Sequence, residues 1–184
     1  FDNGTVVIGE EKLSKYGHKH KIKKLSLFGT TKTNIHAVKA IENADVIFIG
    51  PGSLYSSIIS NFLHPKLLTA VKASNALKVY ICNVSTEKGE TENFSVEDHL
   101  KILEQYSISY DAVLINSSVP KIPDDSLISP LLLNENIDID KILIKSDIVD
   151  AKHPLYHNPD KLGQKCYQIV VDSGKILRKK YSRK

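Results

Sequence analysis

The sequence predicts an α/β protein in which a parallel sheet carries helices on both of its faces, giving three layers. Two observations carry this prediction. Largely apolar runs at residues 45–49, 78–82 and 112–115 are typical of strands buried on both faces, as in parallel sheets. Helix-like segments stand between these runs, and such strand–helix–strand alternation is typical of right-handed crossovers. The 184 residues, 41% of them hydrophobic, suffice for one domain with a sizeable core.

The N-terminal segment is predicted to hold two short strands, at residues 5–8 and 22–28, separated by a polar, lysine-rich loop at 9–21. Residues 34–43 carry apolar side chains at a three-residue spacing, which favours a helix. The sequence contains no Met and begins near Asn3-Gly4, a turn dipeptide. We therefore expect that an N-terminal part of the domain precedes it.

The central elements are bounded by recognisable signals. Residues 50–53 (GPGS) end the first buried run, and the serine is expected to cap a short helix that ends near residue 61. A second helix is expected over 65–74, with proline in its first turn. Residues 95–98 match a capping box, which begins a helix that ends near residue 106.

The C-terminal third is less regular. Residues 117–135 include three prolines and are expected to be irregular, whereas 141–144 predict a strand and 159–172 a helix that a glycine ends. We therefore expect one α/β domain over residues 1–174. The basic tail at 175–184 is expected to be a solvated end.

Composition and charge exclude several classes of protein. The formal net charge is only +4, and much of the excess lies in residues 17–24 and in the tail, so we expect no nucleic-acid partner. No apolar run approaches the roughly 20 residues that span a bilayer, so we expect no membrane partner. The two cysteines are far apart, and no signal pattern begins the sequence, so a cytoplasmic location is expected.

The loops that follow the buried runs are the candidate ligand loops. Ligands of open parallel sheets bind beyond the carboxyl ends of the strands. Residues 50–53, 83–91 and 116–119 each follow a buried run. We therefore expect these loops at one edge of the sheet.

The first loop has features that suit a phosphate. Gly50 and Gly52 would let the backbone approach an anion closely, and Pro51 would stiffen the turn. The following helix would present N–H groups at its start, with hydroxyls from Ser53 and Ser56. A plain strand-to-helix turn with a serine cap explains the same residues equally well.

The second loop and the helix after it hold further polar candidates. Asn83, Thr86 and Thr91 could bind polar groups of a ligand, and Glu90 could accept from a ribose or sugar hydroxyl. A solvated loop is the favoured alternative before any resemblance is considered. His99 could act as an acid/base or a phosphate donor, or could equally be a histidine on the helix surface.

Five segments in fixed order carry a resemblance to a known family. They are residues 44–57 (ADVIFIGPGSLYSS), 78–84 (KVYICNV), 89–91 (GET), 98–99 (DH) and 153–162 (HPLYHNPDKL). In this order they closely resemble the gluconeogenesis-factor family, which is described as UDP-N-acetylglucosamine-binding. That family belongs to the wider superfamily of 2-phospho-L-lactate transferase (CofD-like).

The resemblance implies a Rossmann-like core that binds a nucleotide diphosphate and lacks its N-terminal part here. It implies a non-catalytic regulator of carbon metabolism and cell morphogenesis that binds a UDP-sugar, with no cofactor and with a homodimer as an option. The alternative is a transferase of phosphorus-containing groups that would need Mg²⁺. We assign no catalytic or metal-binding residue. The residues assigned to the ligand are Gly50, Pro51, Gly52, Ser53, Tyr55, Ser56, Asn83, Thr86, Gly89, Glu90, Thr91 and His99.

Two positions depart from the family pattern. Phe94 stands where a tyrosine is expected after the GET loop, and Tyr156 stands where an arginine is expected before His157. If these positions touch the base or the phosphate, we expect weaker binding or a different ligand preference.

Overall fold

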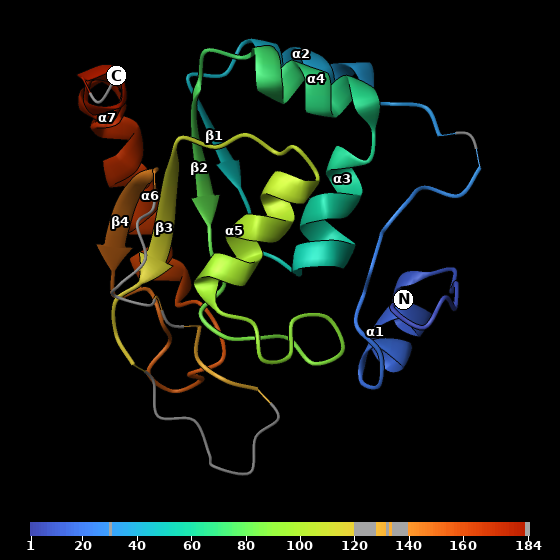
Figure 1. Cartoon of the computed structure of the whole chain (residues 1–184). Helices are drawn as coiled ribbons and strands as arrows, with labels where there is room; N and C mark the ends of the chain where they lie inside the picture. Colours follow the sequence, from blue (N-terminus) through green and yellow to red (C-terminus); the bar gives the residue numbers. More distant parts are fainter. Residues whose placement is uncertain (30, 120–127, 132, 134–139, 183–184) are drawn as a thin grey trace.

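A four-stranded parallel sheet forms the centre of the molecule (Figure 1). The computed structural model describes residues 1–29, 31–119, 128–131, 133 and 140–182. The strands lie in the order β1-β2-β3-β4, and every neighbouring pair is parallel. Their bounds are Val46–Ile49 (β1), Leu77–Ile81 (β2), Ala112–Asn116 (β3) and Ile142–Ser146 (β4). The predicted α/β fold is confirmed.

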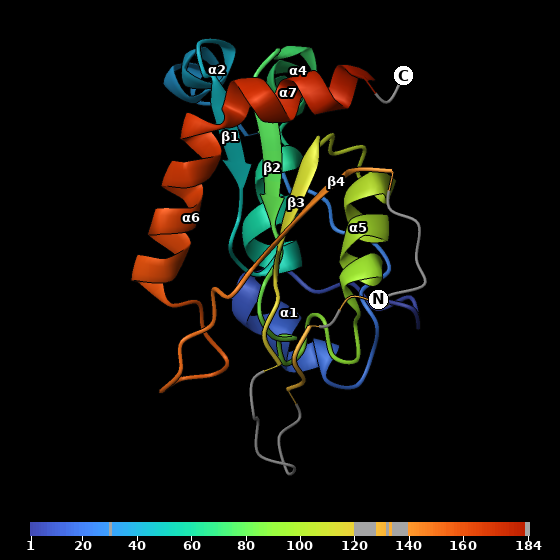
Figure 2. The ribbon, with the colours of Figure 1, turned by 90° about the vertical axis from the view of Figure 1, so that its left-hand side faces the viewer.

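Helices cover both faces of this sheet. Figure 2 shows α5 and α6 on opposite sides of the strands. The helices are α1 (Glu10–Gly17), α2 (Ile35–Glu42), the π-helix η1 (Leu54–Ile59), α3 (Ser60–Phe62), α4 (Pro65–Ala73), α5 (Val96–Gln105), α6 (Pro159–Val171) and α7 (Ser173–Ser182). The predicted helices at 34–43, 65–74, 95–106 and 159–172 are confirmed to within two residues at each end.

The alternation of side chains along β2 builds a core on each face. Tyr80 packs into the cluster that contains Leu103 of α5. Val79 and Ile81 point the other way, into the cluster that contains Ile169 of α6. All five residues of β2 are buried, as are all five of β3, because helices cover both faces of these inner strands.

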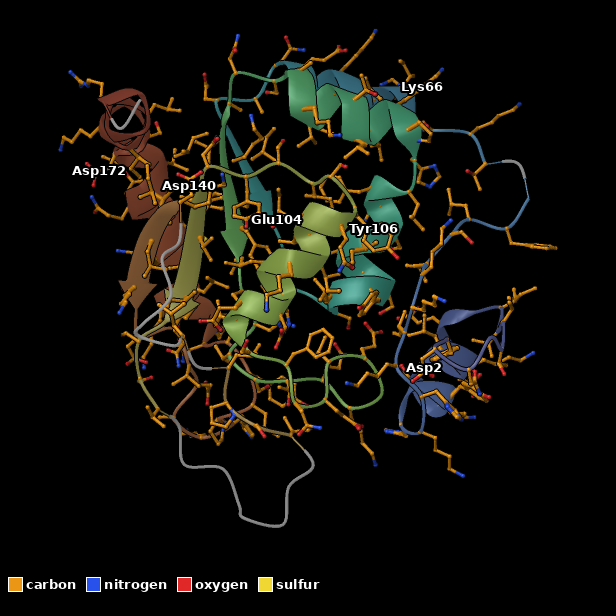
Figure 3. The ribbon with its side chains drawn as sticks, in the orientation of Figure 1. Asp2, Lys66, Glu104, Tyr106, Asp140 and Asp172 are labelled. Carbon is orange, nitrogen blue, oxygen red and sulfur yellow. The ribbon has the colours of Figure 1, made fainter. Side chains whose placement is uncertain are left out.

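The predicted N-terminal strands are wrong. Residues 5–8 and 22–28 are irregular, and the predicted loop at 9–21 contains α1. Neither segment pairs with the sheet in the described part of the chain, so their alternation of apolar residues had no partner strand to stabilise it. Instead, the backbone N–H of Leu25 donates to the hydroxyl of Tyr106, which Figure 3 labels at the end of α5.

The tail is also more ordered than predicted. Residues 173–182 form α7, and Ile176 and Leu177 pack against the α6 side of the sheet. Gly174 therefore lies within a helix and does not end one. Of the region predicted to be irregular, residues 120–127, 132 and 134–135 lie outside the described residues, and those described belong to no helix or strand.

Candidate functional site

The loops after β1 and β2 lie against each other at the carboxyl edge of the sheet, as predicted. The amide of Gly52 donates to Asn83 Oδ1 at 3.2 Å, and Asn83 Nδ2 donates back to the carbonyl oxygen of Gly52 at 3.0 Å. Ser53 Oγ donates to Glu87 Oε1 at 2.7 Å. The two loops therefore form one hydrogen-bonded unit.

Glycine is required at the start of the first loop. Gly50 has φ +93°, and a Cβ there would lie 2.9 Å from the carbonyl oxygen of Ile81 at the end of β2. The chain thus leaves β1 by passing directly over the neighbouring strand, and only glycine permits both the backbone angle and the contact.

The N-terminus of η1 is already occupied by a carboxylate of the chain. Glu90 Oε2 accepts from the amides of Tyr55 at 3.0 Å and Ser56 at 3.2 Å, and only 6% of Glu90 is exposed. The expectation of free amides for a phosphate is therefore wrong at these two residues, because Glu90 supplies the negative charge that a helix start favours.

Most polar candidates in the second loop hold the loop together. Thr91 Oγ1 accepts from the amide of Glu87 at 2.8 Å. Thr86 bonds to Ser129 twice, once through its own amide and once as the acceptor of the Ser129 amide, each at 2.8 Å. With Asn83 bound to Gly52, these side chains build the site's frame.

The helix α1 is docked on the same loop. A Cβ at Gly17 would overlap the carbonyl oxygen of Gly89, and a Cβ at Gly89 would overlap that of Ser14. His18 Nδ1 lies 2.8 Å from Glu92 Oε1. Gly89 therefore lets the backbone of the loop pack directly against the backbone of α1.

His99 lies in the core, at neither of its two predicted places. It is fully buried, its Nδ1 lies 3.0 Å from the carbonyl oxygen of Ser95, and its ring meets Phe94 edge to face. Burial lowers the pKa of His99, so the ring is neutral near pH 7. Phe94 thus packs against a core histidine and does not line the ligand loops' cavity.

A cavity of about 540 Å³ lies where the two loops meet. Of the predicted ligand residues, Pro51, Gly52, Ser53, Asn83 and Thr86 line it. Those that do not are Gly50, Tyr55, Ser56, Gly89, Glu90, Thr91 and His99.

Sequence reasoning missed three side chains of the cavity lining, those of Glu87, Lys88 and His157. The first two lie in the predicted loop and the third lies in a segment of the resemblance. Desolvation raises the pKa of the half-buried Glu87 carboxyl, whereas burial lowers the pKa of His157. Tyr156, 67% exposed, lines the same cavity.

The third predicted loop lies at the same edge but serves another contact. Ser118 Oγ donates to Asp147 Oδ1 at 2.9 Å, and Asn116 Oδ1 accepts from the amide of Ile148 at 3.2 Å. These bonds tie the ends of β3 and β4 together. Asp147 also accepts from Lys161 Nζ at 2.7 Å, and this bond lowers the pKa of Asp147.

A larger cavity, of about 700 Å³, lies at the opposite edge, between α2, α4 and α7. Lys66, labelled on α4 in Figure 3, is one of its lining residues. We take the smaller cavity as the candidate site because ligands of parallel sheets bind at the carboxyl edge. In the described part of the chain, no group of three or more His, Cys, Asp or Glu side chains could hold a metal ion.

The sequence over residues 1–173 matches the family described as 2-phospho-L-lactate transferase CofD. The chain belongs to this family. Its ordered loop motifs and its parallel sheet agree with that membership. No helix among the described residues is both long and apolar enough to cross a bilayer.

Relatives named gluconeogenesis factor resemble the chain at the level of sequence. The putative gluconeogenesis factor of Aquifex aeolicus is 43% identical over 124 residues, which are 65% of this chain and 38% of that protein. The gluconeogenesis factor of Bacillus subtilis is 41% identical over 128 residues, or 68% of this chain and 39% of that protein. The chain thus spans less than half the length of these relatives.

A solved structure resembles the chain at the level of the fold. The crystal structure of a UPF0052-family protein from Bacillus halodurans superposes with a TM-score of 0.77 at 34% sequence identity. The match covers 89% of this chain and 56% of that protein.

Proposed function

We propose that the protein binds UDP-N-acetylglucosamine at the cavity between the two loops and acts as a non-catalytic regulator of carbon metabolism and cell morphogenesis. The observation that carries the proposal is the convergence of the loops after β1 and β2 on one cavity of about 540 Å³. That volume lies within the range of small-molecule sites. Relatives named gluconeogenesis factor support the regulatory part of the proposal.

The cavity lining suits a ligand with many hydroxyl groups. Glu87 offers carboxylate oxygens and Lys88 offers an ammonium group. The hydroxyls of Ser53 and Ser85 donate to Glu87 and to the carbonyl oxygen of Leu155, so they offer a ligand their acceptor oxygens. A cytoplasmic location and assembly into a homodimer accompany the proposal. Light scattering on the purified protein would test the homodimer.

Calorimetric titration of the full-length protein with UDP-N-acetylglucosamine tests this function, with GDP as the comparison ligand. We expect saturable heat with the UDP-sugar and none with GDP. Preference for GDP, or no heat with either ligand, would contradict the proposal.

A second candidate function is transfer of a phosphorus-containing group, favoured by the match of residues 1–173 to the transferase family. Such chemistry on a diphosphate would draw on Mg²⁺ to neutralise developing charge. Because the described residues offer no cluster of metal ligands, we derive no metal-dependent step from them. Turnover of a guanosine-diphosphate-linked lactate by the full-length protein in the presence of Mg²⁺ would establish this function.

A further inference from the structure

The helix α1 lies along the loop that follows β2. The backbones of the two elements meet so closely at Gly17 and Gly89 that a Cβ on either glycine would overlap a carbonyl oxygen of the other element. At the start of α1, the negative charge of Glu10 reaches Glu87, where it adds to the desolvation that chiefly raises the pKa of that carboxyl. The loop is therefore held by α1 as well as by the loop after β1.

The carboxylate of Glu92, directly after this loop, ties the loop to α1. Its Oε1 accepts from the amide of Gly89 at 2.9 Å and lies 2.8 Å from Nδ1 of His18, the residue that follows α1. Desolvation acts to raise the pKa of Glu92, but the bonds with His18 and Gly89 outweigh it, so the pKa is lowered. Because an ionised carboxylate can only accept, the ring nitrogen of His18 is the donor in this contact. One oxygen thus accepts from both the loop and the end of α1.

The backbone that Glu92 fixes carries Lys88. This lysine directly precedes Gly89, has an exposed side chain and lines the cavity. It is the only lysine or arginine among the cavity's described lining residues. An ammonium forms strong, charge-assisted hydrogen bonds with phosphate oxygens. Because a long side chain loses conformational freedom when it binds, a backbone that is already fixed lowers the cost of binding.

From these contacts we infer that Glu92 is a positioning residue of the ligand site, which holds the backbone at Gly89 against α1 and thereby places Lys88 for the phosphates of a bound nucleotide sugar. This inference rests on the proposed function, since it assumes that a nucleotide sugar binds at this cavity. Glu92 does not line the cavity, so it acts through Lys88. An effect of charge alone would have the opposite sign, because a carboxylate repels phosphates and its removal would make binding tighter.

Calorimetric titration of the full-length protein with UDP-N-acetylglucosamine tests the inference. Glu92→Ala removes both bonds, and Glu92→Gln keeps an uncharged acceptor for them. Lys88→Ala removes the ammonium, and the double variant that combines it with Glu92→Ala shows whether the two residues act together. Glu11→Ala is the matched control, because the carboxylate of Glu11 is exposed and pairs with Lys15 on the same helix, α1.

We expect Lys88→Ala to weaken binding by about tenfold, the order of one charge-assisted hydrogen bond, and Glu92→Ala by about three- to fivefold. The double variant should bind as Lys88→Ala does, because Glu92 acts through the ammonium. Glu92→Gln should recover part of the loss, and the control should bind as the wild type does. Circular dichroism and thermal unfolding of each variant separate a loss of binding from a loss of folding. If Glu92→Ala fails to fold, the same comparison with Glu92→Gln decides, with a smaller loss that is again absent beside Lys88→Ala.

Unchanged or tighter binding by Glu92→Ala would overturn the inference, since Glu92 would then have no role in binding beyond its charge. Unchanged binding by Lys88→Ala would overturn it as well, and so would equal losses from Glu92→Ala in the presence and absence of Lys88. In each of these cases the wild-type protein still binds the UDP-sugar, and the proposed function stands. Failure of the wild-type protein to bind would instead contradict the proposed function itself.

Discussion

The loop that follows β2 carries two carboxylates, Glu87 and Glu90, whose surroundings are opposite. Glu90 is buried and accepts from two amides of η1, so it stabilises the junction of the two loops. Glu87 is half-buried, accepts from Ser53 and faces the cavity. The comparison shows that one loop combines a structural half with a cavity-facing half, and that residue type alone does not separate them.

The largest expected effect is a loss in the free energy of unfolding when Glu90, in the structural half of the loop, is replaced. Glu90→Ala would leave the buried amides of Tyr55 and Ser56 without their acceptor, so we expect a loss of about 2–3 kcal/mol in the free energy of unfolding. Glu87→Ala, the matched change in the cavity half, should cost about 1 kcal/mol or less, because it removes a single hydrogen bond at a partly solvated site. Urea unfolding of both variants measures the difference. Equal losses would mean that the two halves are not distinct.

The packing of α1 on the loop gives the next effect. Gly17→Ala places a methyl group onto the backbone of Gly89, so we expect a destabilisation of about 1–3 kcal/mol from overpacking. Gly163 in α6 provides the control, because a Cβ there would meet nothing within 4 Å. Gly163→Ala should stabilise the protein by up to about 1 kcal/mol through helix propensity. A neutral Gly17→Ala in thermal unfolding would show that α1 does not pack on the loop in solution.

Much of this architecture follows from the sequence, and the failures have physical causes. Local apolar runs predicted the buried strands. The capping box of Ser95 and Asp98 predicted the start of α5, and the structure contains it. The cavity's frame at Gly52 and Asn83 follows from the rule that loops of parallel strands meet at one edge.

The roles of Glu90 and His99 depended on contacts that no local pattern records. Glu90 meets amides of residues 55 and 56, and the ring of His99 is buried against the core. The strand predicted at 22–28 was wrong for the same reason. An alternating pattern forms a strand only when a neighbouring strand pairs with it. His157 was missed because its place in the cavity lining depends on its bridge to Val149, which no local pattern records.

Two histidines, the fully buried His99 and the half-buried His157, predict a dependence of stability on pH. Burial lowers the pKa of both His99 and His157 in the folded protein, so the unfolded chain binds more protons as the pH falls below about 6.5. The two histidines should therefore lower stability as the pH falls from about 7 to 5, and Glu87, whose pKa is raised by desolvation, acts in the opposite direction. Carboxyls whose pKa is lowered, such as Asp147 and Asp98, lose their contribution only below about pH 4, so they do not interfere in this window.

Comparison of variants isolates the contribution of one ring. His99→Gln should flatten the fall in stability between pH 7 and 5 by at most the about 1.4 kcal/mol per pH unit that one proton provides. His36→Gln, at an exposed position on α2, should leave the slope unchanged. Urea unfolding at several pH values measures both slopes. An unchanged slope in His99→Gln would show that the ring is protonated as readily in the folded protein as in the unfolded chain.

The smallest expected effect is a gain in affinity for UDP from a substitution at Tyr156, in the cavity-facing part of the molecule. Tyr156 is largely exposed at the rim of the cavity, where the family pattern places an arginine. Tyr156→Arg brings a cation to this rim, within reach of the phosphates of a UDP-sugar bound in the cavity. An exposed ion pair contributes up to about 1 kcal/mol, so we expect affinity for UDP to rise by up to about fivefold at low salt. The gain should decrease as salt is added, because exposed charges are screened. Tyr156→Gln, which adds no charge, should show no such gain. No gain for Tyr156→Arg, or an equal gain for Tyr156→Gln, would show that the phosphates do not pass this rim.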